Sequence, residues 1–387
     1  MKIIYLRRSY LPVKISKILL SMKNKSTQRL LGVDLLRGIA AYAVVFVHSG
    51  DETLGLPISQ NAIALRMGFY FAVPFFLATS FYFLTSRNKI DISKQFWRSR
   101  VERILIPYAV WSLIYVAFRS FFFFQSKKID RLWEFLQDPL AIIFFGGASY
   151  QLYFLPLLFT GTFLVAIAKY MAKIRTNIIV VGLLTIFSMI IHEWLLSSGN
   201  AFGLNPNTAF QSLTASWNMG SLPPLRFLLV QVAWLIKCLP YIFMGMLLQP
   251  LCNQVNKWNS TYRLLTIFSC AIIFLLSNVG SFSGISGTLK DILQAYSLLL
   301  LSIALSHYIQ KGWIFQSVGA CSFGIYLIHP FAMVGVKGFL AKILPNLSNE
   351  VSIISMMTIS IASFAIAWVA VALMMKNKWI AKYTLGV

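Results

Sequence analysis

Charged side chains are scarce in this sequence. They account for 12% of its 387 residues, whereas 58% are hydrophobic and 15% are aromatic. A soluble protein carries about a quarter charged residues, because water must solvate its surface. The deficit excludes an ordinary soluble domain, and the long uncharged runs indicate a chain whose surface lies largely in lipid.

Acidic residues and cysteines are few as well. Against 34 Lys and Arg there are only 11 Asp and Glu, so the net charge is +23. In a soluble protein such an excess suggests nucleic acid, but here the basic residues sit mainly in alternate loops and no such motif is present. We therefore expect no nucleic-acid partner. The four cysteines lie in or beside apolar runs without a C-x-x-C spacing, which predicts packing residues and neither a disulfide framework nor a metal site.

Ten apolar runs are long enough to cross a bilayer. They are 31–50, 62–85, 104–124, 150–171, 177–197, 227–250, 264–280, 289–309, 314–336 and 351–375. The sequence thus predicts an all-α, polytopic integral membrane protein with about ten transmembrane helices over 31–375. The apolar stretch 139–147 is too short to cross and predicts a re-entrant or interfacial piece. The stretch 198–226, punctuated by Gly, Asn, Pro and Ser, predicts a loop.

The basic residues predict an orientation. Of the 34 Lys and Arg, 23 fall on the side that holds both termini, seven on the other side and four within spans. The positive-inside rule then places both termini in the cytoplasm. We expect a basic cytoplasmic segment over 1–30 and a short cytoplasmic tail over 376–387.

The first run carries two polar side chains on one stripe. Arg37 and His48 are eleven residues apart, which is about 20° from the same helix face and about 16 Å along the axis. An arginine within a span is costly, so it is expected to face protein or a wet cavity, and Asp34 is placed to pair with it. The alternative is that Arg37 reaches the cytoplasmic interface and His48 simply ends the helix.

Several stretches resemble one known family. Residues 33–41 followed by His48 are similar to the first helix of the membrane acyltransferase-3 family, whose members carry an Arg, ten residues and a His. Further resemblances follow in the family's order: Pro-Phe-Phe-Leu at 74–77, an R-x-x-R leading to Pro-Tyr at 100–108, and a Gly-Ile-Tyr-Leu-Ile-His stretch within 322–330.

The resemblance has two departures. Thr79-Ser80 stands where the family usually has Ser-Gly, and Tyr153 stands where many members have Trp. The chain resembles the stand-alone members, because no room is left for the SGNH-type esterase domain that some members carry.

The resemblance implies a bacterial, multi-pass protein of the cytoplasmic (inner) membrane. It implies transfer of an acyl group, commonly acetyl, from cytoplasmic acyl-CoA to a hydroxyl of an envelope glycan or lipid-linked saccharide, with no bound cofactor. His48 is then the catalytic base, aided by Arg37. Arg100 and Arg103 are candidates for donor or transition-state contacts, with Glu102 orienting one of them. The alternative for this arginine pair is a positive anchor before the third span.

Other polar residues are candidates for supporting roles. By the predicted topology Arg66, His192, Glu193 and His329 lie near the depth of His48, on the side away from the cytoplasm. They form either an acceptor site or partners that orient His48. His329 precedes Pro330, so it is also expected to satisfy backbone beside a helix kink. For His192 and Glu193 the other interpretation is an interfacial position.

Two further functions remain open at this point. A transporter or flippase that exports a glycan or an acylated compound also suits ten spans with intramembrane charges. No inverted repeat is visible and acidic residues within spans are few, which disfavours ion-coupled transport. A scaffold subunit of an envelope assembly is a third hypothesis, but it leaves the Arg37 and His48 stripe without a purpose.

Overall fold

The computed structural model describes residues 30–50, 58–86, 92–197, 223–255, 258–278, 285–309, 312–345 and 350–387. Within these ranges the regular structure is helical, apart from one isolated parallel bridge between Ile58 and Val351. The basic segment 1–29 and most of the predicted loop 198–226 lie outside the described residues. The predicted C-terminal bound of that loop is wrong, because residues 223–226 already belong to a helix.

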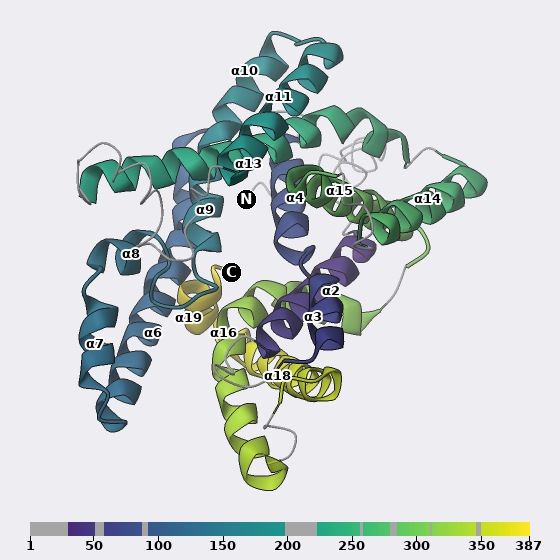
Figure 1. The fold of residues 1–387 in the computed structure, drawn as a ribbon. Helices are drawn as coiled ribbons and strands as arrows, with labels where there is room; N and C mark the ends of the chain where they lie inside the picture. The colour runs from purple at the N-terminus through teal and green to yellow at the C-terminus, as the bar shows by residue number, and fades with distance from the viewer. Residues whose placement is uncertain are drawn as a thin grey trace, which may run out of the picture.

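Ten helical segments in the described part are long and apolar enough to cross a membrane (Figure 1). This confirms the predicted all-α polytopic membrane protein. The single-helix spans are α2 (Leu31–Ser49), α11 (Ile178–Ser197), α13 (Pro223–Val255), α14 (Ser260–Asn278), α15 (Gly287–Leu305), α16 (Trp313–Ile343) and α18 (Ile353–Met374).

Three spans are built from more than one helix. They are α3 (Gln60–Met67) with α4 (Ala72–Thr85), α5 (Lys94–Arg100) with a π-helix (Val101–Leu105) and α6 (Ile106–Gln125), and α9 (Phe154–Gly161) with a 3-10 turn (Thr162–Leu164) and α10 (Val165–Lys173). Short helices complete the chain: α7 (Ile129–Leu136), α8 (Pro139–Phe144), α19 (Lys378–Ile380) and a closing π-helix (Ala381–Leu385). The third span therefore begins ten residues before the predicted 104.

Serine side chains start several of these helices. Ser59, Ser93, Ser286 and Ser352 each accept a hydrogen bond from a backbone N–H of the first turn of α3, α5, α15 and α18. A hydroxyl at this position satisfies a donor that has no partner within the helix. Hydropathy alone gives approximate ends, and these caps fix where the helices begin.

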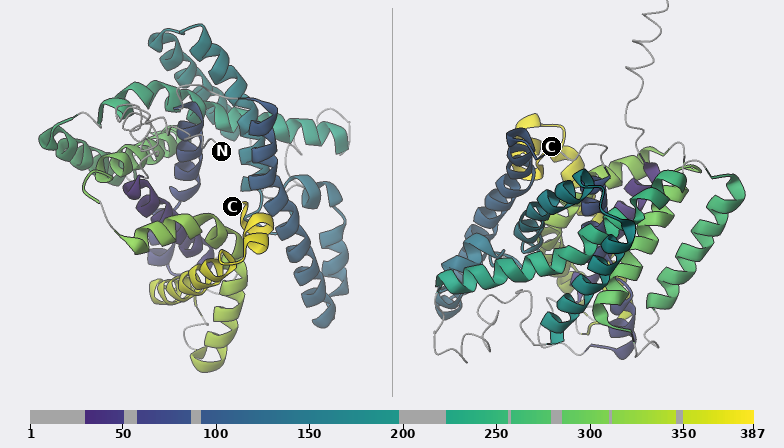
Figure 2. Two further views of the ribbon diagram at one scale, coloured as in Figure 1. Left: turned by 180° about the vertical axis from the view of Figure 1, so that it is seen from behind. Right: turned by 90° about the horizontal axis from the view of Figure 1, so that it is seen from above.

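The most buried of the ten spans is α2. It packs against α16, α18 and α15, and a second core forms where α4 meets α13 and α15. In contrast, α14 and α11 present exposed large apolar side chains along their length, as expected for helices at the edge of a bundle that faces lipid. Figure 2 shows α13 crossing the other long helices obliquely.

A buried ion pair joins two distant segments. Arg226, in the first turn of α13, donates to Asp138 at 2.8 Å, and both side chains are little exposed. The other oxygen of Asp138 accepts from Ala141 N and so caps α8. The stretch expected to be re-entrant or interfacial is therefore a short capped helix tied to α13.

Candidate active site

Close helix contacts hold α2 in place. Gly32 packs so tightly on α15 that a Cβ there would collide with the backbone oxygen of Ser302, and its N–H donates to the hydroxyl of Ser306 at 3.0 Å. On the other side Gly319 of α16 lies against the backbone of buried Asp34. Small residues allow such close approach between helices in a membrane. The helix that carries Arg37 and His48 is thus clamped between α15 and α16.

Three aromatic rings meet at the end of α2. The ring centroid of half-buried His48 lies 4.3 Å from that of Tyr150 and 5.7 Å from that of His329, and the two imidazoles are inclined by only 26°. The hydroxyl of Tyr150 lies 3.5 Å from Nε2 of His329. Side chains from α2, α16 and the turn before α9 are therefore brought together.

Pro330 determines which nitrogen of His329 carries a proton. In an α-helix the carbonyl of Tyr326 would accept from the N–H four residues later, but that residue is Pro330, which has none. Nδ1 of His329 lies 2.7 Å from this carbonyl oxygen and donates to it. Nε2 is then left with a lone pair directed toward Tyr150. His329 both satisfies backbone beside the proline and faces His48, so the two interpretations of its role are compatible.

The turn that carries Tyr150 is held from several sides. Gly146 adopts a positive φ of 79°, where a side chain would collide with Tyr153, and its N–H donates to the hydroxyl of Tyr108 at 2.9 Å. The hydroxyl of Tyr326 donates to the carbonyl of Gln151. Buried hydrogen bonds of this kind fix the direction of the Tyr150 ring.

Tyr150 was not singled out from the sequence. The signal was present, since a polar Ser-Tyr-Gln follows two glycines at 146–151 directly before an apolar run. The run was interpreted as the start of a span at 150, whereas α9 begins only at Phe154.

Arg37 lies on the same unbroken helix as His48, about 16 Å away along its axis. Both side chains are half-buried, although most residues of α2 are buried. Asp34, one turn before Arg37, is 7% exposed and packs where α2 meets Gly319. The two residues therefore occupy different depths of one helix, and any reaction that uses both must extend over that distance.

The arginine pair lies at a π-helix, with Arg100 directly before it and Arg103 within it. Pro107, at the start of α6, has no N–H to donate to the carbonyl of Arg103. The five residues before α6 form the π-helix, whose turn is wider than that of an α-helix. Arg100 is half-buried with its guanidinium 5.2 Å from the ring centroid of Phe96, whereas Arg103 is exposed.

Glu102 has one partner outside the arginine pair. Its carboxylate accepts from Nε of Arg98 at 2.9 Å, one α-helical turn earlier, and this pair is largely solvent-exposed. Gly386, with a φ of 67°, lies against the backbone of Arg103, so the last turn of the chain supports the π-helix.

Glu193 belongs to a second polar cluster. It accepts from Thr288 N at 2.9 Å at the start of α15, and the hydroxyl of Thr288 is 2.7 Å from Nδ1 of His192. His192 is only 2% exposed, so protein encloses its ring. Its interfacial position in the membrane stays a prediction. Arg66 lies half-buried in the last turn of α3.

Comparisons with known proteins identify the family of this chain. The sequence model of the acyltransferase-3 family, described as an acyltransferase domain, matches residues 30–374. An amino-acid racemase of Enterococcus faecalis is 31% identical over 145 residues, which are 37% of this chain and 18% of that protein. The chain thus spans less than a fifth of that relative, and the racemase activity is named for that whole protein. No solved structure matches the chain. Since the family model covers nearly its whole length, the chain belongs to the acyltransferase-3 family of membrane acyltransferases.

Proposed function

We propose that this protein is an O-acyltransferase that moves an acyl group, most simply acetyl, from cytoplasmic acyl-CoA to a hydroxyl of an envelope glycan or lipid-linked saccharide. The observation that carries the proposal is the cluster of His48, Tyr150 and His329 at the end of the most buried span. Family membership supplies the acyltransferase chemistry.

His48 is the proposed general base. A sugar hydroxyl is a weak nucleophile at neutral pH, and an imidazole within hydrogen-bond reach takes its proton as the oxygen attacks the thioester carbonyl. The tetrahedral intermediate collapses with cleavage of the carbon–sulfur bond. The proton held by His48 passes to the departing CoA thiolate, which leaves an oxygen ester and free CoA.

Tyr150 and His329 are the proposed positioning residues. The Tyr150 ring lies against that of His48, and its hydroxyl bonds Nε2 of His329, whose other nitrogen is fixed by the Tyr326 carbonyl. A base with a fixed ring orientation loses less entropy on reaching the transition state. This chain of contacts transmits the constraint of Pro330 in α16 to His48 in α2.

The arginines are the proposed donor contacts. CoA carries several phosphates, for which guanidinium groups are the preferred partners. The pantetheine arm separates these phosphates from the thioester, so phosphate-binding cations need not touch the base. Exposed Arg103 and half-buried Arg100 are suited to bind the phosphates. In the predicted topology these two arginines lie on the cytoplasmic side, and Arg37 lies on α2 between that side and His48.

The test uses the organism that carries the gene, with the chromosomal copy deleted and replaced by variants. Ester-linked acetate is released from isolated envelope glycans by mild alkali and quantified. We expect His48→Ala to lose at least about 100-fold in acylation, as for removal of a general base. His307→Ala, at the end of α15 and outside the cluster, is the matched control and retains acylation.

A second measurement separates the enzyme from a transporter. Purified protein is given acetyl-CoA labelled in its acetyl group together with the host glycan. Label found in the glycan supports the proposal, with Arg103→Gln raising the KM for acetyl-CoA more than it lowers kcat. Glycan movement across liposomes without any ester formed would overturn it in favour of export.

A further inference from the structure

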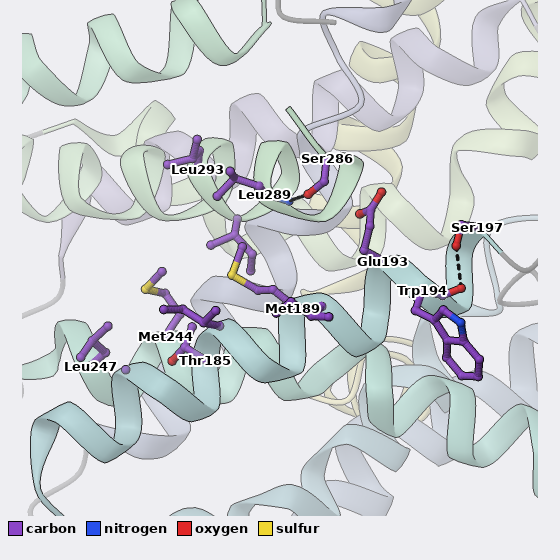
Figure 3. A pocket seen from close by; sticks show the side chains of 14 residues that line it. Thr185, Met189, Glu193, Trp194, Ser197, Met244, Leu247, Ser286, Leu289 and Leu293 are labelled. Carbon is purple, nitrogen blue, oxygen red and sulfur yellow. Dashed lines mark hydrogen bonds between the residues drawn. The ribbon is translucent and has the colours of Figure 1, made fainter. Parts of the chain in front are cut away.

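A cavity lies away from the cluster around His48. It is a groove of about 750 Å³ between α11, α13 and α15, shown in Figure 3. Apolar side chains such as Met189, Met244 and Leu289 form most of its lining. None of the residues proposed for acyl transfer contributes to it.

One wall of this groove faces the bilayer. Ile186, Ile190 and Trp194 line it from α11 and are 58%, 62% and 70% exposed. A Cβ added at Gly182, which also lines the groove, would meet no other atom within 4 Å. Within a membrane the medium that reaches such a surface is lipid hydrocarbon.

The groove has the length and polarity of a lipid chain with its headgroup. From Gly182 to Ser197 it follows α11 for about 22 Å, which exceeds the roughly 15 Å hydrocarbon depth of one leaflet. Glu193 and Ser286 lie at one end of the groove in Figure 3, whereas Leu247 lies toward the other. The polar Thr185 lies near Leu247, but its hydroxyl donates to the backbone oxygen of Val181. An amphiphile oriented along α11 matches this gradient.

The polar end carries a negative charge. Glu193 is the one charged residue among those that line the groove. Its carboxylate accepts from Thr288 N, but a carboxylate offers about four lone-pair positions and can accept further donors. A headgroup that carries an ammonium complements this carboxylate, whereas a purely anionic headgroup is repelled by it.

We propose that this groove is a binding site for one hydrocarbon chain of an amine-headed phospholipid, phosphatidylethanolamine, whose ammonium group binds Glu193. The site is distinct from the proposed acyl-transfer centre and its test does not depend on that activity.

The test is native mass spectrometry of the full chain released from nanodiscs made of equal phosphatidylethanolamine and phosphatidylglycerol. We expect wild-type protein to retain phosphatidylethanolamine over phosphatidylglycerol by about tenfold, the effect of one charge-assisted contact. Gly182→Trp fills the groove and should remove the retained lipid. Gly335→Trp in α16 is the matched control, because its Cβ also meets no atom within 4 Å, and should retain lipid as wild type does.

Glu193→Gln tests the headgroup separately. We expect this variant to keep a bound lipid and to lose the preference for phosphatidylethanolamine. Equal retention by Gly182→Trp and Gly335→Trp would overturn the site. Equal retention of both lipids by wild type would overturn the ammonium contact. If wild type instead holds a second copy of the chain and Gly182→Trp releases that copy, the lipid site is overturned and the groove is an interface between copies.

Discussion

The two ring nitrogens of His329 have different roles, and substitutions of His329 can separate the two roles. Nδ1 donates to the Tyr326 carbonyl that Pro330 leaves without a backbone donor, while Nε2 faces Tyr150 and His48. We predict that His329→Asn and His329→Leu both lose acyl transfer but differ in stability. The side-chain amide of Asn reaches the position of Nδ1 and keeps the bond to the carbonyl, whereas Leu offers no donor.

The structure gives the size of each effect. His329 is fully buried, so His329→Leu leaves a buried carbonyl without a partner, at a cost of about 1–3 kcal/mol in the free energy of unfolding. His329→Asn should stay close to wild type. Neither side chain replaces Nε2, so both variants should lose about 10- to 100-fold in transfer rate, as for loss of a group that orients a general base.

The chain contains its own reporter of unfolding. All four cysteines are free and buried, so a thiol-reactive dye reports unfolding in detergent as the temperature rises. Transfer is followed with acetyl-CoA labelled in its acetyl group. Equal melting of the Asn and Leu variants would refute the role of Nδ1. Full activity of the Asn variant would refute the role of Nε2, since the amide leaves that side of the pocket empty.

Other substitutions test the supports of the site by the same thiol assay. Gly386→Ala forces a side chain into a left-handed conformation against Arg103 and should cost about 1–2 kcal/mol, together with a higher KM for acyl-CoA; an unchanged KM would separate the closing turn from the donor site. Asp138→Asn removes the charge facing partly buried Arg226 and should cost about 1–3 kcal/mol; exposed Glu134→Gln is its control. Gly32→Ala should disrupt the contact of α2 with α15 and lower the melting temperature, and normal melting would contradict that packing.

Much of the fold was predictable because lipid imposes a simple rule. A span must be long, apolar and helical, so the runs were visible without any knowledge of packing. The internal breaks were not, because they depend on local chemistry such as the missing N–H of Pro107 that accompanies the π-helix. The pairing of Glu102 with Arg98 could have been foreseen from their four-residue spacing alone.

The site was only partly predictable for a different reason. His48 and His329 carry recognisable neighbours in the sequence, but their approach depends on how α2 and α16 pack, which hydropathy does not report. Tyr150 lies in a turn whose direction is set by bonds to Tyr108 and Tyr326, far away in the sequence. Contacts of this range depend on the whole assembled bundle.

The meeting of His48 with His329 also has a consequence for biogenesis. The two rings come from the first and the ninth spans, so roughly three quarters of the chain is synthesised between them. Until α16 inserts, the growing chain holds Arg37 and His48 in the bilayer without the helix that completes their surroundings, which makes the early intermediate costly. If His48 is the base, as proposed, a half-made chain has no assembled site. Truncation before residue 329 is then expected to yield a product without acyl-transfer activity.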